Sequence, residues 1–87
     1  MLIMTIEGIE FIHDHNFQTV TPKLIYREEI KNESDGQRKI QNYLNRYMTY
    51  EQVHESEKKN HVKYEYWLRD HGGLYYNIGF NYETYEI

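Results

Sequence analysis

Two segments in the last third of the chain, "HVKYEYWLRD" and "LYYNIGFNYETYEI", limit the fold more than any other feature. In both segments, apolar or aromatic residues occupy every second position, and this alternation is typical of a β-strand with one buried face. A slip of one residue would turn the whole apolar row toward solvent, so the pattern also limits how the strands can pair. The sequence therefore predicts an antiparallel β-hairpin over residues 61–86.

Matching the two apolar rows predicts the register of this hairpin. The predicted pairs are Leu68 with Leu74, Tyr66 with Tyr76, and Tyr64 with Ile78. This register leaves the three-residue loop 70–72, in which Gly72 can take the left-handed conformation without strain. On the other row, the same register places Trp67 opposite Tyr75.

The stretch "HDHNF" raises a choice between a metal site and the tip of a second hairpin. A loop over residues 14–16 would pair His13 with Phe17 and would place Asn16 in the left-handed position, which asparagine tolerates well. The arms of this N-terminal hairpin would be residues 9–13 and 17–21.

Two residues that restrict the backbone flank this hairpin. Gly8 indicates a bulge or a turn, and Pro22 indicates a break in the chain. Residues 23–30, which follow, fit either a strand or the lead-in to a helix.

The middle of the chain, "SDGQRKIQNYLNRYM", predicts a helix over residues 35–48. Ser34 can cap this helix, and Gln37 stands three residues later, which is the spacing of a capping box. Four large side chains recur at helical spacing on one face: Ile40, Tyr43, Leu44 and Tyr47. A second capping box, Thr49 with Gln52, leaves two alternatives, which are one long helix that bends near Thr49 or a short second helix.

These elements predict one α+β domain over residues 1–87. An antiparallel sheet of four or five strands would include the C-terminal β-hairpin, and the main helix would pack on one face of that sheet. We expect six apolar residues to be buried in the core: Ile40, Leu44, Leu68, Leu74, Ile78 and Phe80.

The composition excludes several classes of protein. The chain has no cysteine, which excludes disulfides and thiolate metal sites, and no apolar run approaches the ~18–20 residues of a membrane span. The start of the chain is interrupted by Glu7 and Glu10 and does not resemble a signal peptide, so we expect a cytoplasmic protein. The net charge is −4 and both ends are acidic, which disfavours broad contact with phosphates.

No catalytic constellation is evident in the sequence. Ser34 and Ser56 are the only serines, and the adjacent Glu28 and Glu29 would point to opposite faces of a strand. We therefore predict that the chain is not an enzyme and that it binds no cofactor.

Three histidines are candidate metal ligands. His13 and His15, with His61 as a third ligand, could hold a zinc ion, because neutral imidazoles are common zinc ligands. His15 lies in the predicted loop, however, so it would not share a face with His13. A metal-dependent enzyme is therefore only the third hypothesis, and no metal site is predicted.

The outer row of the C-terminal hairpin is the main candidate for a binding surface. Protein-binding surfaces favour Tyr, Trp and Asn. The candidate residues are Trp67, Tyr75, Asn77, Asn81 and Tyr85. We expect Trp67 and Tyr75 to form its energetic centre, with the acidic residues Glu7, Glu10 and Asp14 as the next candidate contact. A second copy of the chain, in a homodimer, could also cover this row.

A nucleic-acid-binding or transcription-regulatory domain is the alternative. One helix face carries side chains of the kinds that read base edges in a major groove: Arg38, Gln41, Asn42, Asn45 and Arg46. The aromatic row of the hairpin could also stack single-stranded bases. A solvated helix face carries similar side chains, so this hypothesis ranks second.

The sequence as a whole predicts a non-enzymatic protein-binding module. The chain lacks alanine and is rich in Ile, Asn, Lys and Tyr, whose A/T-rich codons indicate a low-GC genome. This profile fits a small phage or mobile-element protein that inhibits a host enzyme, such as an anti-CRISPR or another anti-defence inhibitor. An acidic surface suits that role because it can occupy a basic nucleic-acid channel.

Overall fold

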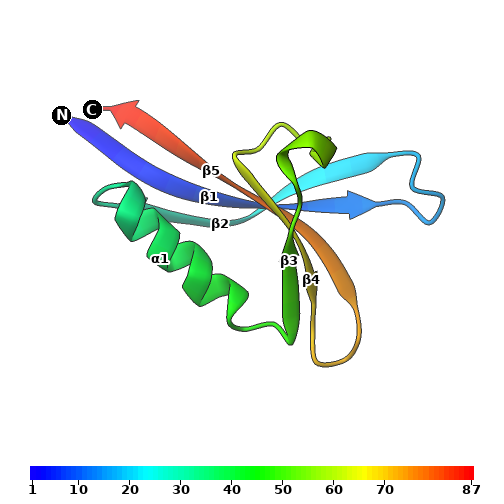
Figure 1. The fold of residues 1–87 in the computed structure, drawn as a ribbon. Coiled ribbons are helices and arrows are strands. Elements are labelled where there is room, and N and C mark those ends of the chain that lie inside the picture. The colour runs from blue at the N-terminus through cyan, green and yellow to red at the C-terminus, as the bar shows by residue number, and fades with distance from the viewer.

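Five strands form one antiparallel sheet, in the order β2-β1-β5-β4-β3, in the computed structural model, which describes residues 1–87 (Figure 1). The elements are β1 (Leu2–His13), β2 (Val20–Ile30), α1 (Glu33–Leu44), β3 (Thr49–Gln52), the short 3-10 helix η1 (Glu55–Glu57), β4 (Tyr64–Arg69) and β5 (Tyr75–Glu86). Helix α1 lies on one face of the sheet, and β4 and β5 form a C-terminal hairpin. The predicted α+β class, with one main helix and this hairpin, is confirmed. Neither helix has the length and apolar character that crossing a membrane requires.

Strand β5 lies at the centre of the sheet, where it pairs with β1 on one side and with β4 on the other. Strands β1 and β5 have twelve residues each, and they bring the two termini side by side (Figure 1). The Met1 amino group donates a hydrogen bond to the Ile87 carbonyl at 3.0 Å, and the Ile87 amide donates to the Met1 carbonyl at 2.9 Å.

The N-terminal hairpin exists, but its turn differs from the prediction. His13 pairs with Val20 rather than with Phe17, so β1 and β2 are joined by residues 14–19 instead of by a three-residue loop. The left-handed position is taken by Phe17, at φ 56°, and not by Asn16.

The Asp14 carboxylate explains the longer loop. It accepts hydrogen bonds from the Gln18 amide at 2.8 Å and from the Thr19 hydroxyl at 3.0 Å. The hydrogen bond from the Gln18 amide, the largest contribution, holds the pKa of Asp14 below its ordinary value. The carboxylate therefore caps a wide loop, because its two oxygens reach donors that lie beyond a tight turn.

The first two strands contain the predicted bulge but not the predicted break. Their register shifts between Gly8 and Ile9, where Ile25 is the extra residue of β2, so the bulge at Gly8 is confirmed. Pro22 lies inside β2, which is tolerated because β2 is an edge strand. Residues 23–30 belong to this strand and not to a helix.

Helix α1 begins and ends earlier than predicted. Asn32 caps it by accepting a hydrogen bond from the Asp35 amide at 2.9 Å, and Asp35 accepts in return from the Lys31 amide at 3.0 Å. This reciprocal pair satisfies two donors at the N-terminus, so the predicted cap, Ser34, lies within the first turn. The helix ends at Leu44 rather than at residue 48.

The segment after α1 forms the edge strand β3 instead of continuing as a helix. Thr49 and Gln52 pair with β4 and do not form a capping box. The Met48 amide donates to the Arg69 carbonyl at 2.9 Å, at the point where this pairing begins. The expected second helix is reduced to η1, because hydrogen bonds to a neighbouring strand outweigh the weak helical preference of residues 49–52.

The register of the C-terminal hairpin is two residues away from the prediction. The observed pairs are Leu68 with Tyr76, Tyr66 with Ile78, and Tyr64 with Phe80. Residues 70–74 join the strands, and Leu74 is 63% exposed rather than buried. Trp67 lies opposite Asn77 and not opposite Tyr75. Because the shift is even, the side chains keep the faces that were predicted.

A second carboxylate cap, Asp70, explains this register. It accepts hydrogen bonds from the amides of Gly72 and Leu74, both at 2.9 Å, and from the Tyr76 hydroxyl at 3.1 Å. The positive φ of the turn, 87°, falls on Gly73 and not on Gly72. The hydrogen bond from the Leu74 amide is the main reason that the pKa of Asp70 lies below its ordinary value.

The core lies between α1 and the sheet. Its buried residues are Ile6, Ile30, Ile40, Leu44, Tyr66, Leu68, Ile78 and Phe80. Of the six residues predicted to be buried, only Leu74 is exposed. Tyrosines surround this core, as where Tyr43 packs edge-on against Phe80 with ring centroids 5.7 Å apart. Burial raises the pKa of Tyr82 to about 12, so its hydroxyl stays protonated at neutral pH.

Substituting Gly79 with Ala should destabilise the fold. A Cβ atom at this position would lie 2.6 Å from Val62 Cγ2 and 2.8 Å from Phe11 Cε2, and both side chains are buried. Overpacking of this kind lowers the free energy of unfolding by roughly 1–3 kcal/mol, which urea denaturation would measure. Gly72→Ala is the control, because its Cβ would meet only Asp70 Oδ1 at 3.4 Å. Equal stability of the two variants would contradict this packing.

Asp70→Asn should make the stability depend less on pH. The pKa of Asp70 is lower in the folded chain than in the unfolded chain, so its contribution is present above pH ~3.9 and is lost as the pH falls through the folded-state value. The variant should therefore be less stable than the wild type at neutral pH, and the difference should shrink in acid. Urea denaturation at about pH 7 and about pH 2.5 tests this. A difference that stays constant would refute the capping role.

Candidate binding site on the open face of the sheet

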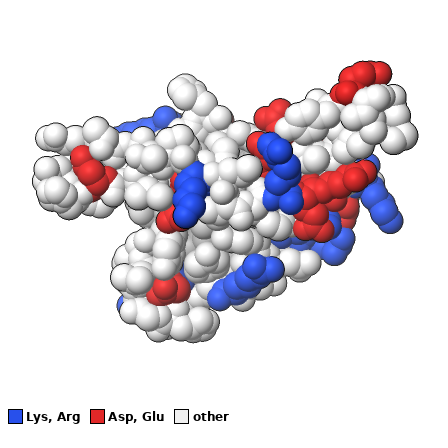
Figure 2. Space-filling view, turned by 180° about the vertical axis from the view of Figure 1, so that it is seen from behind, with Lys and Arg blue, Asp and Glu red and all other residues white.

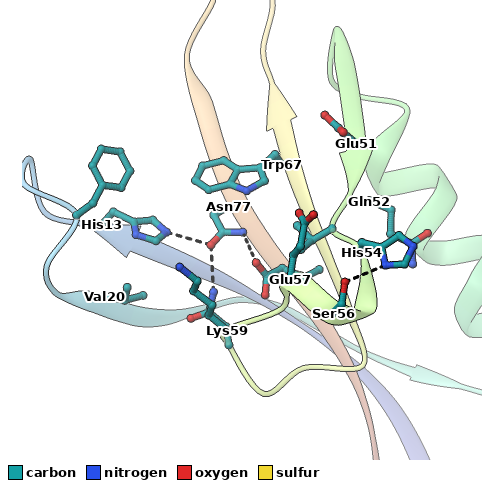
Figure 3. Close-up of a pocket in the computed structure, with 14 residues that line it drawn as sticks. His13, Val20, Glu51, Gln52, His54, Ser56, Glu57, Lys59, Trp67 and Asn77 are labelled. Atoms are coloured by element: carbon teal, nitrogen blue, oxygen red, sulfur yellow. Dashed lines mark hydrogen bonds between the residues drawn. The ribbon is translucent and has the colours of Figure 1, made fainter.

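The face of the sheet opposite α1, called the open face from here on, is only partly covered. The segment between β3 and β4 lies over part of it, where Val62 packs against Gly79 next to Phe11. The same face holds a cavity of about 890 Å³ (Figure 3). Its lining comes from the β1–β2 end (His13, Phe17 and Val20), from several residues within 51–60, and from β4 and β5 (Glu65, Trp67 and Asn77).

Asn77 is the centre of a buried polar network in this lining. Its Nδ2 donates to Glu65 Oε2 at 3.1 Å and to the Tyr66 carbonyl at 3.2 Å, and both of these atoms can only accept when Glu65 is ionised. Its Oδ1 therefore faces His13 Nε2, at 3.0 Å, and Asn60 Nδ2, at 3.2 Å. Because Oδ1 is an acceptor, the Nε2 of His13 must carry the proton. Figure 3 shows His13 directed at Asn77 along this bond.

Glu65 is the one member of the network with an unused oxygen. The side chain is buried, with 4% of its surface exposed, and Oε1 has no hydrogen-bond partner in the chain. No Lys, Arg or His forms an ion pair with this carboxylate. A buried carboxylate oxygen without a donor is unfavourable, so an N–H group that bound Glu65 Oε1 would stabilise the site.

Aromatic rings stand beside this carboxylate network. The Trp67 ring stacks on the His13 ring with centroids 5.6 Å apart and an interplanar angle of 23°. His13 also packs against Phe17, with ring centroids 5.3 Å apart. Trp67 is 36% exposed and Phe17 is 69% exposed, so both present apolar surface to a ligand.

Phe17 occupies an unusual backbone conformation for a large side chain. It is the only residue other than glycine with a positive φ, at 56°. Such a conformation is sterically unfavourable for bulky residues and often marks functional positions. The surrounding Asp14-capped loop holds Phe17 in this conformation at the mouth of the cavity.

The charged side chains of the lining are mostly acidic. Glu51, Glu57 and Glu65 contribute three carboxylates, and Lys59 contributes the only ammonium group. The neighbouring Lys58 is not part of the lining, because its Nζ donates to the carbonyls of Val62 and Lys63. The cavity therefore favours a cationic ligand over an anionic one.

A serine and a histidine also meet in the lining, but they lack the surroundings of a catalytic pair. Ser56 Oγ and His54 Nδ1 are 3.3 Å apart. Both residues are exposed, and no carboxylate binds the other ring nitrogen of His54. The contact therefore lacks the orienting acid of a Ser-His-acid triad, and it does not support nucleophilic catalysis.

The candidate protein-binding residues do not form one surface. Trp67 and Asn77 meet on the open face, but Asn77 is buried and not a surface contact. Tyr75 is exposed and pairs with Arg69, whose guanidinium carbon lies 5.7 Å from the ring centroid. The predicted Trp67–Tyr75 cross-strand pair is therefore wrong, because the loop is two residues longer than expected.

The remaining two residues of that row lie farther along β5. Asn81 is half-buried and accepts a hydrogen bond from the Lys63 amide at 2.8 Å. The Tyr85 hydroxyl donates to Glu7 Oε1 at 3.0 Å, and this hydrogen bond raises the pKa of Tyr85. Both side chains thus support the sheet and lie outside the cavity lining.

The acidic residues Glu7, Glu10 and Asp14 do not lie together on one surface. Glu7 pairs with Arg27, and Asp14 caps its loop. Glu10 stands at an even position of β1 opposite Ile78, and it therefore points to the α1 side of the sheet. Their separation follows from the alternation of side chains along β1, which puts Glu7 and Glu10 on opposite faces.

The polar face of α1 is exposed, but most of its side chains have partners. Arg38 forms an ion pair with Asp35, and Gln41 donates to Asn45 and to the Tyr50 hydroxyl, both at 2.9 Å. The remaining two members of this set are Asn42 and Arg46, and the Arg46 guanidinium lies over the Tyr43 ring. On the opposite side of the molecule from that seen in Figure 1, Figure 2 shows Lys and Arg interspersed with Asp and Glu, without one continuous basic area.

The histidines considered as metal ligands are not brought together. His13 binds Asn77, while His15 and His61 are exposed. The structure contains no group of three or more His, Asp or Glu side chains placed to hold a metal ion.

Sequence reasoning missed Phe17, Glu65 and the covering segment before β4. Glu65 stands in the outer row of an alternating strand, where a carboxylate normally faces water. The polar segment after residue 52 fits a helix by its sequence, so no local pattern indicates that it lies over the sheet. A carboxylate between tyrosines in a strand was the only available signal.

No protein-family model, curated protein or solved structure matches this chain.

Asn77→Ala should destabilise the protein strongly. The substitution removes the donor that satisfies Glu65 Oε2 and leaves the whole buried carboxylate without a partner. We expect the free energy of unfolding to fall by roughly 2–4 kcal/mol in urea denaturation. Asn42→Ala, on the exposed face of α1, is the matched control and should change little. If both variants unfold at the same urea concentration, the network does not stabilise the fold.

Proposed function

We propose that this chain is a non-enzymatic protein-binding module and that its contact surface is the open face around the cavity. The observation that carries this proposal is the pair Trp67 and Phe17 at the cavity. Both rings are exposed, and one of them is held in an unfavourable backbone conformation. Exposed rigid aromatics beside a cavity are typical centres of protein interfaces.

The dimensions of the molecule are compatible with this role. A standard interface buries ~800 Å² on each partner, which is about an eighth of the 6169 Å² surface of this chain. The cavity, the loop with Phe17 and the segment between β3 and β4 together provide a continuous region on one face. The proposed interface therefore needs no rearrangement of the fold.

We further propose that the partner is a host enzyme that acts on nucleic acids and that the chain inhibits it in the cytoplasm. The net charge of −4, the small size and the low-GC composition support a phage or mobile-element inhibitor of the anti-CRISPR or anti-defence kind. Nucleic-acid-processing enzymes carry basic channels, and an acidic inhibitor is attracted to them.

Direct binding to nucleic acid is less well supported. Arg38 and Lys39 on α1 are already paired with Asp35 and Glu28. Phosphate binding requires several free cations, because each contact releases a counterion from the nucleic acid. These ion pairs leave few such cations on α1.

Trp67→Ala should abolish the capture of a partner from a low-GC bacterial lysate. The wild-type chain, used as bait, should retain one stoichiometric protein, and loss of a central aromatic should weaken its binding by roughly 2 kcal/mol, or about 30-fold. Tyr75→Ala is the matched control, because Tyr75 is more exposed than Trp67 but lies outside the cavity lining. Circular dichroism checks that both variants fold.

Three results would overturn this proposal. Retention of no stoichiometric protein would remove the protein partner, and equal capture by Trp67→Ala would move the contact elsewhere. A shift of DNA or RNA probes that weakens steeply with salt would favour the nucleic-acid alternative. Light scattering of the purified chain distinguishes a further case, in which a second copy covers the open face.

A further inference from the structure

We propose that the cavity receives the guanidinium group of an arginine from the partner protein, with Glu65 as its carboxylate partner and Trp67 as its stacking surface. This inference rests on the protein-binding function proposed above and names the chemistry that the site recognises. It follows from the unused oxygen of Glu65, the aromatic wall and the charge of the lining.

One carboxylate oxygen of Glu65 lacks a hydrogen-bond donor. Its Oε2 is satisfied by Asn77, whereas Oε1, in a side chain that is only 4% exposed, has no donor. Because Oε1 is fully buried, a ligand can reach it only when the Glu65 carboxylate turns toward the cavity. An N–H donor bound there would remove this unfavourable state, and a cationic donor would also balance the buried charge. Neutral acceptors and anions cannot do this.

The chain itself places no cation on Glu65. Lys58 is bound to two backbone carbonyls and pairs with Glu55. His13 donates to Asn77, and Lys59 lines the cavity without binding Glu65 Oε1. None of these groups donates to Glu65 Oε1 in this structure, which leaves the position open to a cation from a partner.

The aromatic wall of the site favours a guanidinium group over an ammonium group. Trp67 is partly exposed in the same lining, and its indole is the aromatic ring that attracts cations most strongly. A guanidinium is planar and weakly hydrated, so it can stack on an indole while its N–H groups reach a carboxylate. An ammonium group is strongly hydrated and gains less from such a site.

The site is better suited to an arginine side chain of a protein than to free arginine. The cavity of about 890 Å³ is near the upper end of the ~300–1,000 Å³ that small-molecule sites occupy, and so it has room for flanking residues as well as one side chain. Glu51 and Glu57 also line it, and they would repel the α-carboxylate of free arginine but attract its α-ammonium group. The size of the cavity, rather than its charge, therefore favours a peptide.

The test uses the single tryptophan of the chain, which is Trp67, as a reporter. The indole N–H resonance of wild-type protein is followed during titration with three capped tripeptides, acetyl-Gly-X-Gly-amide, in which X is arginine, lysine or citrulline. Citrulline has nearly the shape of arginine without the charge. We expect saturable shifts with the arginine peptide, with a Kd on the order of 1 mM, and at least tenfold weaker binding of the other two.

Glu65→Gln provides the matched change in the protein. It removes the charge but keeps an acceptor for Asn77, and it should weaken binding of the arginine peptide at least tenfold. Glu29→Gln, on the exposed edge strand β2, removes one charge elsewhere and should leave binding unchanged. The comparison of arginine with citrulline uses wild-type protein and therefore remains decisive even if Glu65→Gln fails to fold.

Several outcomes would overturn the inference. Equal binding of the citrulline peptide would remove the role of the charge, and equal binding of the lysine peptide would remove the preference for guanidinium. Tighter binding of free L-arginine than of the peptide would assign the cavity to a small molecule. If Trp67→Ala abolishes partner capture while the arginine peptide does not bind, this inference fails and the proposed function stands. If the peptide binds but no protein partner is retained, the proposed function fails and the arginine pocket remains.

Discussion

The pairing of β5 with both β1 and β4 is the constraint on which the rest of the structure depends. Residues 78–80 have a hydrogen-bonded neighbour strand on each side, and their side chains alternate between the two faces. Ile78 and Phe80 enter the core beneath α1, while Gly79 faces the open side and admits Val62 and Phe11. Residues 78–80 thus supply two core side chains on one face and, at Gly79, allow Val62 and Phe11 to pack closely against the open face.

The two faces of the sheet are stabilised by different physical effects. On the α1 side, apolar and aromatic side chains exclude water in the ordinary way. On the open side, a buried amide and a buried carboxylate occupy the positions where apolar residues would be more favourable. A local departure of this kind, together with the unusual backbone of Phe17, is expected at functional positions, because binding sites carry costs that the rest of the fold must offset. The unpaired oxygen of Glu65 connects the proposed protein contact with the proposed arginine, because it is unfavourable in the free chain and a cationic partner would satisfy it.

Much of the fold could be predicted because its signals are local. The alternation in residues 61–86 identified the hairpin and the face of each side chain, and helical spacing placed Ile40 and Leu44 in the core. Apart from the helix expected over residues 49–52, which is the strand β3, the errors concern the ends of elements. Asp14 and Asp70 each bridge a loop through several hydrogen bonds, and this capping lengthened both turns beyond the tight turns that residue preferences favoured. Leu74 is exposed for that reason, although its sequence position fits the apolar row.

The fold class and the faces of the strands follow from local patterns, because a period of two or of 3.6 residues acts within one segment and needs no distant partner. The acidic character follows from composition. The site depends on tertiary contacts. His13, Asn60 and Asn77 come from three separate segments, and their hydrogen bonds exist only after β1, the covering segment and β5 have been brought together. Glu65 is buried by neighbours that are remote in the chain, so no local pattern distinguishes it from a solvated carboxylate. The chemistry of the open face is a product of long-range contacts, which hydrophobic periodicity does not encode.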